Sequence, residues 1–181
     1  MKKALKYFPL VTAVLALAAL IVGFAAPAVV YQAEVFGKQL DPVYYSGWKC
    51  VFGYTAESSV DLGGLGSLEN STKVLSFSFW NLLTYILLIL GIGACVVAFI
   101  KPEFSWLGYA AAGCFVGATV LFFCACSATA FTQFDDKEIA EYLSLGAGAI
   151  VGAILSILAV LCAAAPPVLA LLQKKKIIKL K

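Results

Sequence analysis

Four long apolar segments alternate with shorter polar ones along this chain of 181 residues, and none of the four contains a Lys, Asp or Glu. A helix that crosses a bilayer needs about 20 apolar residues, because each residue adds about 1.5 Å and the hydrocarbon layer is about 30 Å thick. The pattern therefore predicts four membrane-spanning helices. They cover residues 7–30, 75–100, 104–130 and 144–172, all bounds being approximate.

The polar segment at residues 31–74 is the only sizeable region outside these spans, and we interpret it as the first outer loop. Residues 43–55 within it are rich in aromatic and β-branched side chains, which favour strands. We expect a short hairpin or a small sheet there. The predicted fold is a single domain over residues 1–181, an all-α membrane protein whose four-transmembrane-helix bundle carries a small β-containing first extracellular loop.

Composition supports a membrane protein. The chain is 62% hydrophobic and 13% charged, with a mean hydropathy of +0.96. Soluble domains have about 45–50% apolar and about 25% charged residues. The length leaves room for one small bundle and for no separate soluble catalytic domain.

The lysines predict the orientation, because short loops rich in Lys or Arg stay on the cytoplasmic side. One side of the membrane holds the lysines that precede the first span, those that follow the last span and the one in the link between the second and third spans. The other side carries more Asp and Glu than Lys. We therefore expect a multi-pass protein of the plasma membrane with both termini in the cytoplasm. The inner lysines are Lys2, Lys3, Lys6, Lys101, Lys174, Lys175, Lys176, Lys179 and Lys181.

A cleaved secretory signal is the alternative interpretation of the first apolar segment. The chain starts with Met-Lys-Lys, and the small residues of 26–28 resemble a cleavage site. The apolar core of a signal is about 7–15 residues long, whereas this one is long enough to span the membrane. Sequencing the mature N-terminus distinguishes the two, because a start near Val29 or later would remove the first helix.

Small residues spaced by four predict the faces on which the helices pack, since close backbone approach holds helices together in lipid. Such faces occur in the first, third and fourth spans. They serve packing inside one bundle or, alternatively, contact with a second copy. In the second span, the polar Asn81 and Thr84 are expected to bond a neighbouring helix. The small residues are Ala19, Gly23, Gly113, Gly117, Gly148, Gly152 and Ser156.

An aromatic cluster in the first outer loop is the candidate partner-binding site, because Tyr and Trp offer contact area together with a polar group. The simpler interpretation is that these rings anchor the loop at the membrane interface or form its core. The candidates are Tyr44, Tyr45, Trp48, Phe52 and Tyr54.

Much catalytic chemistry is missing from the sequence. The chain has no His, and its four predicted spans hold no Asp, Glu or Lys. Proton-coupled transport, His-based metal sites and catalytic triads depend on such groups. We expect no enzymatic activity, no cofactor, no metal and no nucleic-acid partner.

The cysteines are the remaining reactive side chains. Cys50 lies in the outer loop, and Cys124 and Cys126 lie near the outer end of the third span. Four-helix membrane thiol oxidases carry reactive cysteines in a similar place but use a Cys-x-x-Cys pair. Residues two apart on a helix point to nearly opposite sides, so Cys124 and Cys126 cannot bridge each other within it. We favour inert packing for the cysteines, with redox work or a bridge from Cys50 to Cys124 or Cys126 as alternatives.

The layout of the spans resembles the claudin-type tetraspan arrangement. At the level of residues, the stretch 47–50, Gly-Trp-Lys-Cys, is similar to part of the claudin first-loop motif, but the upstream Trp and the second Cys of the loop are missing. The Met-Lys-Lys start and the stretches 46–49 and 52–54 are more similar to small uncharacterised tetraspan proteins of Gram-positive bacteria. This resemblance implies the topology and no activity.

The sequence thus favours a non-enzymatic integral membrane scaffold, assembly or accessory protein that acts through its first outer loop. Its expected partners are the lipid bilayer and another membrane protein or a second copy. The alternative is a membrane thiol–disulfide oxidoreductase that uses Cys50 with Cys124 or Cys126, and a weaker alternative is an oligomeric pore.

Overall fold

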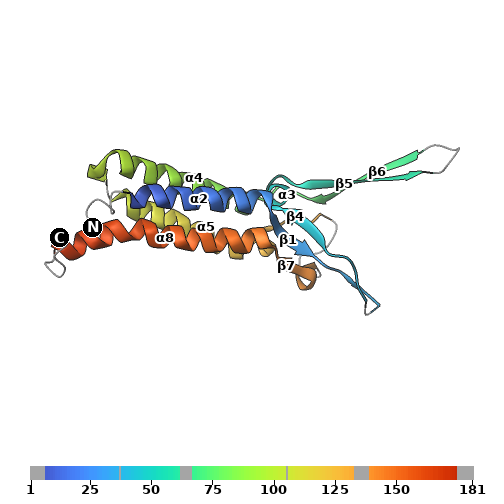
Figure 1. The fold of residues 1–181 in the computed structure, drawn as a ribbon. Helices are drawn as coiled ribbons and strands as arrows, with labels where there is room; N and C mark the ends of the chain where they lie inside the picture. The colour runs from blue at the N-terminus through green and yellow to red at the C-terminus, as the bar shows by residue number, and fades with distance from the viewer. Residues whose placement is uncertain (1–6, 37, 62–66, 105, 133–138, 175–181) are drawn as a thin grey trace.

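A computed structural model describes residues 7–36, 38–61, 67–104, 106–132 and 139–174. Its main helices lie side by side along one axis, and all strands gather at one end (Figure 1). We call this end the β end. Each helix packs against two others, in the cyclic order α2, α8, α5, α4. These helices are α2 (Phe8–Ala25), α4 (Phe79–Ile100), α5 (Leu107–Phe123) and α8 (Ala147–Lys174).

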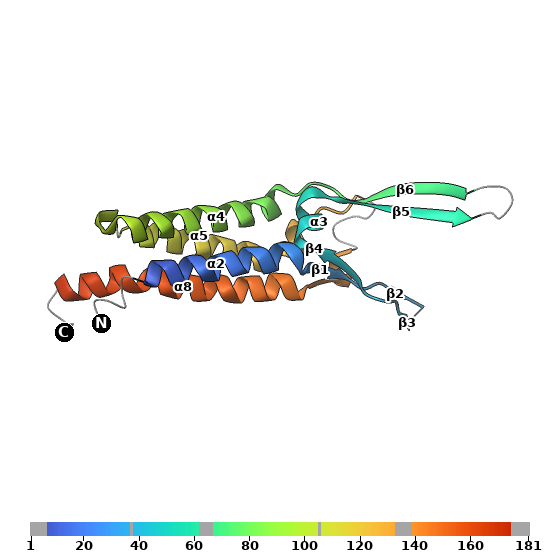
Figure 2. The ribbon, with the colours of Figure 1, turned by 45° about the horizontal axis from the view of Figure 1, so that its top comes forward.

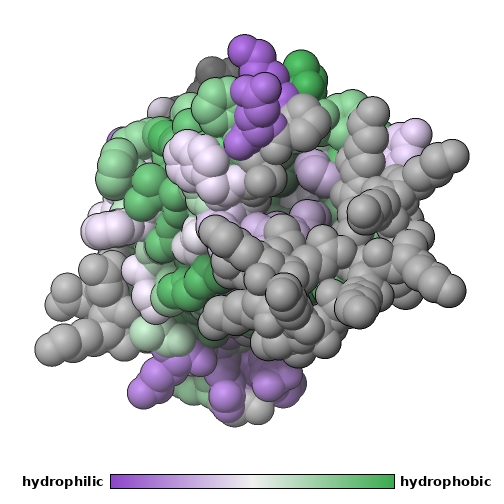
Figure 3. All heavy atoms as spheres, turned by 90° about the vertical axis from the view of Figure 1, so that its left-hand side faces the viewer, coloured by the Kyte–Doolittle hydropathy of each residue, from purple (hydrophilic) through white to green (hydrophobic). Residues whose placement is uncertain are grey.

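In the described part of the chain, three helices are long and apolar enough to cross a membrane by length and composition: Phe8–Ala25, Phe79–Ile100 and Ala147–Leu169. The fourth, α5, is also apolar but has only 17 residues. Figure 3 views the bundle from the end where α2 begins and shows patches of hydrophobic residues on its side, with hydrophilic residues at the top and the bottom of the view. The chain is therefore mostly helical and of a membrane-protein type.

The first helix ends at Ala25, earlier than the predicted bound of residue 30. Pro27 has no backbone N–H to continue the helix, and the residues from Pro27 to Tyr31 form strand β1. This strand is the centre of a three-stranded antiparallel sheet, in the order β4 (Val43–Ser46), β1, β7 (Leu143–Leu145). The start of the predicted outer loop, a later segment of the same loop and the segment before α8 thus contribute to one sheet.

The other predicted spans also differ at their ends. The second helix begins at Phe79, because the preceding residues up to Leu75 belong to strand β6. The third begins at Leu107, after the short 3-10 turn η2 (Pro102–Phe104), and is interrupted at Cys124 before the short helix α6 (Ala125–Ala128). The fourth begins at Ala147, after β7 and the 3-10 turn η3 (Ala140–Tyr142), and continues to Lys174.

The expectation of a small sheet in the outer loop is confirmed, since β4 belongs to the three-stranded sheet, but residues 43–55 do not form a hairpin with each other. A short helix, α3 (Gly47–Phe52), separates β4 from β5 (Tyr54–Asp61). β5 pairs instead with β6 (Ser67–Leu75) in a long antiparallel hairpin that projects beyond the bundle, and β2 (Glu34–Val35) pairs with β3 (Lys38–Gln39) in a second one (Figures 1 and 2). Residue type alone does not show which of these segments pair with each other.

Candidate functional site

The β end rests on the bundle through α3, and Gly47 makes that contact possible. A Cβ atom at this position would lie 2.1 Å from the carbonyl oxygen of Gly23 and 2.2 Å from the hydroxyl of Tyr85. Both distances are far below van der Waals contact. Only glycine therefore allows α3 to sit directly on α2 and α4.

A buried hydrogen bond joins α2 to α4 beneath α3. The Tyr85 hydroxyl donates to the carbonyl oxygen of Gly23 at 2.8 Å. In a continuing helix that carbonyl would accept from the N–H of Pro27, which proline lacks. The tyrosine thus supplies a donor that the sequence of α2 cannot, and the adjacent Gly47 N–H donates to Ala26 at 3.3 Å.

Asn81 connects three elements at the same level. Its side-chain amide donates to the carbonyl oxygen of Cys50 in α3 at 3.3 Å and to the hydroxyl of Thr129 at 3.0 Å. Thr129 in turn donates to the carbonyl oxygen of Ala125 in α6 at 2.7 Å. The prediction that Asn81 bonds a neighbouring segment is confirmed, whereas the hydroxyl of Thr84 donates to Trp80 of its own helix at 3.4 Å.

Phe122 of α5 fills the centre of the bundle just below this layer. Its ring meets Gly23 of α2 and Gly152 of α8, where a Cβ atom would lie 2.7 Å and 2.8 Å from ring atoms. It also contacts Tyr85 of α4 edge to face, with ring centroids 6.2 Å apart. One aromatic side chain therefore touches all three other long helices.

The remaining small residues divide by exposure. Ala19 is buried, Gly148 lies against the carbonyl oxygens of Ala26 and Pro27, and Gly117 lies against the side chain of Leu87. The Ser156 hydroxyl is buried and donates to Gly152 of its own helix at 2.8 Å. Gly113, by contrast, is exposed, and no atom of the described part of the chain lies within 4 Å of where its Cβ atom would be.

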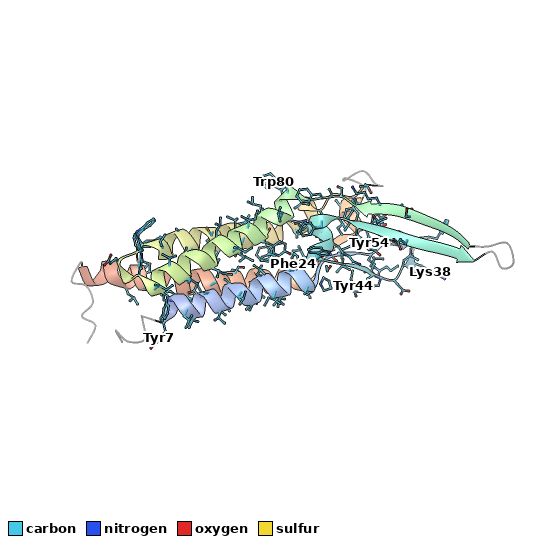
Figure 4. All side chains as sticks on the ribbon, turned by 90° about the horizontal axis from the view of Figure 1, so that it is seen from above. Tyr7, Phe24, Lys38, Tyr44, Tyr54 and Trp80 are labelled. Atoms are coloured by element: carbon cyan, nitrogen blue, oxygen red, sulfur yellow. The ribbon has the colours of Figure 1, made fainter. Side chains whose placement is uncertain are left out.

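The five aromatic candidates do not form one surface. Tyr45 is buried, with its ring 5.9 Å from Phe131 and 6.3 Å from the half-buried Tyr54. Tyr44, Trp48 and Phe52 are exposed, and the rings of the last two lie 4.2 Å apart. Figure 4 shows Phe24 where the bundle meets the β end, and its ring lies 5.2 Å from Trp48. Tyr45 and Tyr54 thus form the core of the β end, and the other three are free to contact lipid or protein.

The three redox candidates are also placed differently. All six cysteines are free thiols; Cys50 is buried, Cys126 half-buried and Cys124 exposed. The Cys50 thiol points to the carbonyl oxygen of Tyr45 at 3.8 Å. Burial raises the pKa of Cys50 to about 11, although a hydrogen bond with Thr129 acts in the opposite direction. At neutral pH this thiol is therefore almost entirely protonated.

Two small cavities accompany these elements. One, of about 220 Å³, lies at the β end and is lined by Cys126, Ser127, Thr129, Ile139, Ala140 and Leu143. The other, of about 230 Å³, lies at the opposite end beside Val97, Ile100, Lys101 and Phe104. Among the described residues, no group of three or more Cys, Asp or Glu is placed to hold a metal ion. Neither cavity brings together an acid, a base and a nucleophile.

Sequence reasoning missed the residues that hold the β end in place, namely Gly47, Tyr85 and Phe122. One signal was available, because Pro27 stands four residues after Gly23 and leaves its carbonyl without a helical donor. No protein-family model matches the chain. No curated protein compared with it matches either. The geometry of the chain itself is therefore the basis for its interpretation.

Proposed function

We propose that the chain crosses the plasma membrane four times, with both termini in the cytoplasm, and acts as a non-enzymatic scaffold, assembly or accessory protein through its β end. The partner is another membrane protein or a second copy. The observation that carries this proposal is the attachment of the β end to the bundle by buried hydrogen bonds and by the close contact of Gly47 with α2 and α4.

The arrangement of the helices supports four crossings. The described chain begins and ends at the end of the bundle opposite the strands (Figure 1). Helix α5 carries no charge and packs between α4 and α8. Its 17 residues rise about 26 Å, close to the hydrocarbon thickness of about 30 Å. The lysine distribution then puts the β end outside the cell.

Exposed aromatic rings at both ends of the bundle support the same placement. Trp48 and Trp80 are exposed at the β end, and Tyr7 and Trp106 are exposed at the other. Such rings gather at the two membrane–water interfaces. Helix α4, which runs between the two levels, has 22 residues and rises about 33 Å. That length matches one bilayer.

The β end is suited to binding because it holds projecting strands on a fixed base. The β5–β6 hairpin pairs from Tyr54 and Leu75 at its base to Asp61 and Ser67. Near the base of the hairpin the outer edge of β6 is covered, where the Thr132 N–H donates to the carbonyl oxygen of Val74 at 3.1 Å. An isolated two-stranded hairpin is marginally stable in water, and uncovered strand edges can pair with another chain. A partner that contacts this hairpin would stabilise it.

Thiol–disulfide chemistry is the alternative function, and the burial and raised pKa of Cys50 argue against it. A nucleophilic thiol is normally partly exposed with a lowered pKa. Cys50 is 1% exposed and its pKa is raised to about 11. Replacing all six cysteines distinguishes the two functions, because a scaffold keeps its partner and a redox enzyme loses its activity.

A pore would require several copies, because Phe115 and Phe122 fill the interior of a single bundle. Single-channel recording from purified protein in planar bilayers tests this function. Discrete conductance steps would support it, and their absence at high protein density would exclude it.

The proposed function is tested by purifying the tagged chain from its native membrane in mild detergent and quantifying the proteins that remain bound. A matched variant joins Thr55 to Lys73, which face each other across the hairpin, by an Asn-Gly turn. This change removes the projecting part and leaves the base intact. We expect a specific partner on the full chain and less of it on the shortened one. Equal recovery of every protein on both chains would contradict binding through the β5–β6 hairpin, and recovery of no specific protein by the full chain would contradict the proposal itself.

A further inference from the structure

The turn between β2 and β3 has an unusual residue at its tip. Val35 pairs with Lys38, so the turn contains two residues, of which Phe36 is the first. Its φ is 52°, and it is the non-glycine residue with positive φ among those that the structure describes. Two-residue hairpin turns of this kind favour Asn, Asp or Gly, because a bulky side chain is strained at positive φ. A phenylalanine there works against the turn.

The Phe36 ring is also not buried against any other described part of the chain. Its exposure is 103% of the reference value, so no other part of the described chain covers it. An aromatic ring buries about 150–250 Å² when it is covered. Strain and full exposure at one residue together point to a contact made outside the chain.

The hairpin that carries Phe36 is held in place on both sides. The Leu40 N–H donates to Ala33 at 2.9 Å, and the side chain of Gln32 donates to Gln39 at 3.3 Å and to Leu40 at 3.4 Å. The ring is therefore presented on a closed hairpin. A rigid support reduces the entropy lost on binding.

The surrounding lipid does not cover this ring if the proposed function is correct. The last helical residue of α2 is Ala25, and the chain then continues outward through β1 and β2 at about 3.3 Å per residue. Figure 2 shows β2 and β3 beyond the end of the bundle. At that height the ring lies beyond the lipid, so a contact that covers it would have to come from protein.

We propose that Phe36 inserts into an apolar pocket on the extracellular part of a partner protein. This inference rests on the proposed function and identifies the residue that anchors the partner. Glu34 and Lys38 are exposed on either side of the tip. The pocket therefore takes one aromatic ring and has charges of both signs at its rim, a basic group facing Glu34 and an acidic group facing Lys38.

The test compares four full-length chains purified from the native membrane: wild type, Phe36→Asn, Phe36→Gly and Phe36→Tyr. Asn and Gly both suit positive φ and both lack the ring, whereas Tyr keeps it. The bound proteins are quantified by isotope-labelled mass spectrometry. We expect one protein to be retained by wild type and Phe36→Tyr and to fall at least tenfold on the other two, as for a residue that dominates an interface.

Thermal unfolding of the same four preparations separates binding from folding. Phe36→Asn and Phe36→Gly should unfold at the same temperature as wild type or higher, because the turn is relieved. Equal retention on all four chains would overturn the role of Phe36 and leave the proposed function intact. Loss on Phe36→Tyr as well would also overturn it. A wild-type chain that retains no protein would refute the proposed function and this inference together.

Discussion

The hydroxyl of Tyr85 donates to the carbonyl oxygen of Gly23 across 62 residues of sequence. This bond lies near the end of α2, just before β1 begins, and directly beneath Gly47. It joins α2 to α4 at one buried point, against which α3 packs. The position of the β end on the bundle therefore depends on it.

Tyr85→Phe should destabilise the protein by about 1–3 kcal/mol, because the buried carbonyl of Gly23 loses its donor. The edge-to-face contact of the ring with Phe122 is kept. The measurement is the free energy of unfolding in mixed detergent. Tyr109→Phe is the control, since Tyr109 is exposed and should change stability little. Equal effects of the two substitutions would show that the bond adds nothing.

Gly152→Ala should destabilise the protein by about 1–3 kcal/mol, since the added methyl group would lie 2.8 Å from the Phe122 ring, which also packs closely against Gly23. Gly113→Ala is the matched control. Nothing lies within 4 Å of its Cβ position, so better helix propensity should leave stability unchanged or raise it by up to about 1 kcal/mol. The free energy of unfolding of both variants is measured. A stable Gly152→Ala with an unstable Gly113→Ala would contradict the assignment of Gly152 to a packed face and of Gly113 to an exposed one.

Cys50 should react slowly with maleimides. In a variant that keeps only this cysteine, labelling at pH 8 should be on the order of 100-fold slower than for a free thiol, because the folded pKa is about 11 against about 8.5. Asn81→Ala, which removes a bond to α3, should speed the reaction. Labelling at the rate of a small thiol would contradict the burial of Cys50.

The same thiol makes stability depend on pH. A pKa raised by folding means that the folded state holds the proton more tightly than the unfolded state. The protonated Cys50 thiol therefore adds to the free energy of unfolding. This stabilisation is complete below a pH of about 8.5 and is lost as the pH rises through about 11, at up to about 1.4 kcal/mol per pH unit. Unfolding of wild type and Cys50→Ala between pH 8 and 11 measures it, and the variant should show the smaller slope. Parallel curves would exclude this linkage.

The apolar pattern located the helices but not their ends, for a physical reason. Val29 and Val30 are as apolar as a helix interior, yet they pair with Leu145 and Ser144 in a sheet. Hydropathy measures transfer to lipid and is the same in both structures, whereas strand pairing joins segments more than a hundred residues apart. Among the site candidates, aromatic composition suggested the outer loop, but only the packing separates the buried Tyr45 from the exposed Tyr44.

In the proposed topology the chain crosses the membrane four times with the β end outside, and α5, with 17 residues, is the shortest of the four crossing helices. To test whether α5 crosses the membrane, one cysteine is placed at Glu103 or at Thr132, on either side of α5, in a chain otherwise free of cysteine. Each variant is then labelled with a membrane-impermeant maleimide. We expect the cysteine at 132 to react in intact cells and the one at 103 to react only after permeabilisation. Equal reaction of both in intact cells would contradict the proposed topology.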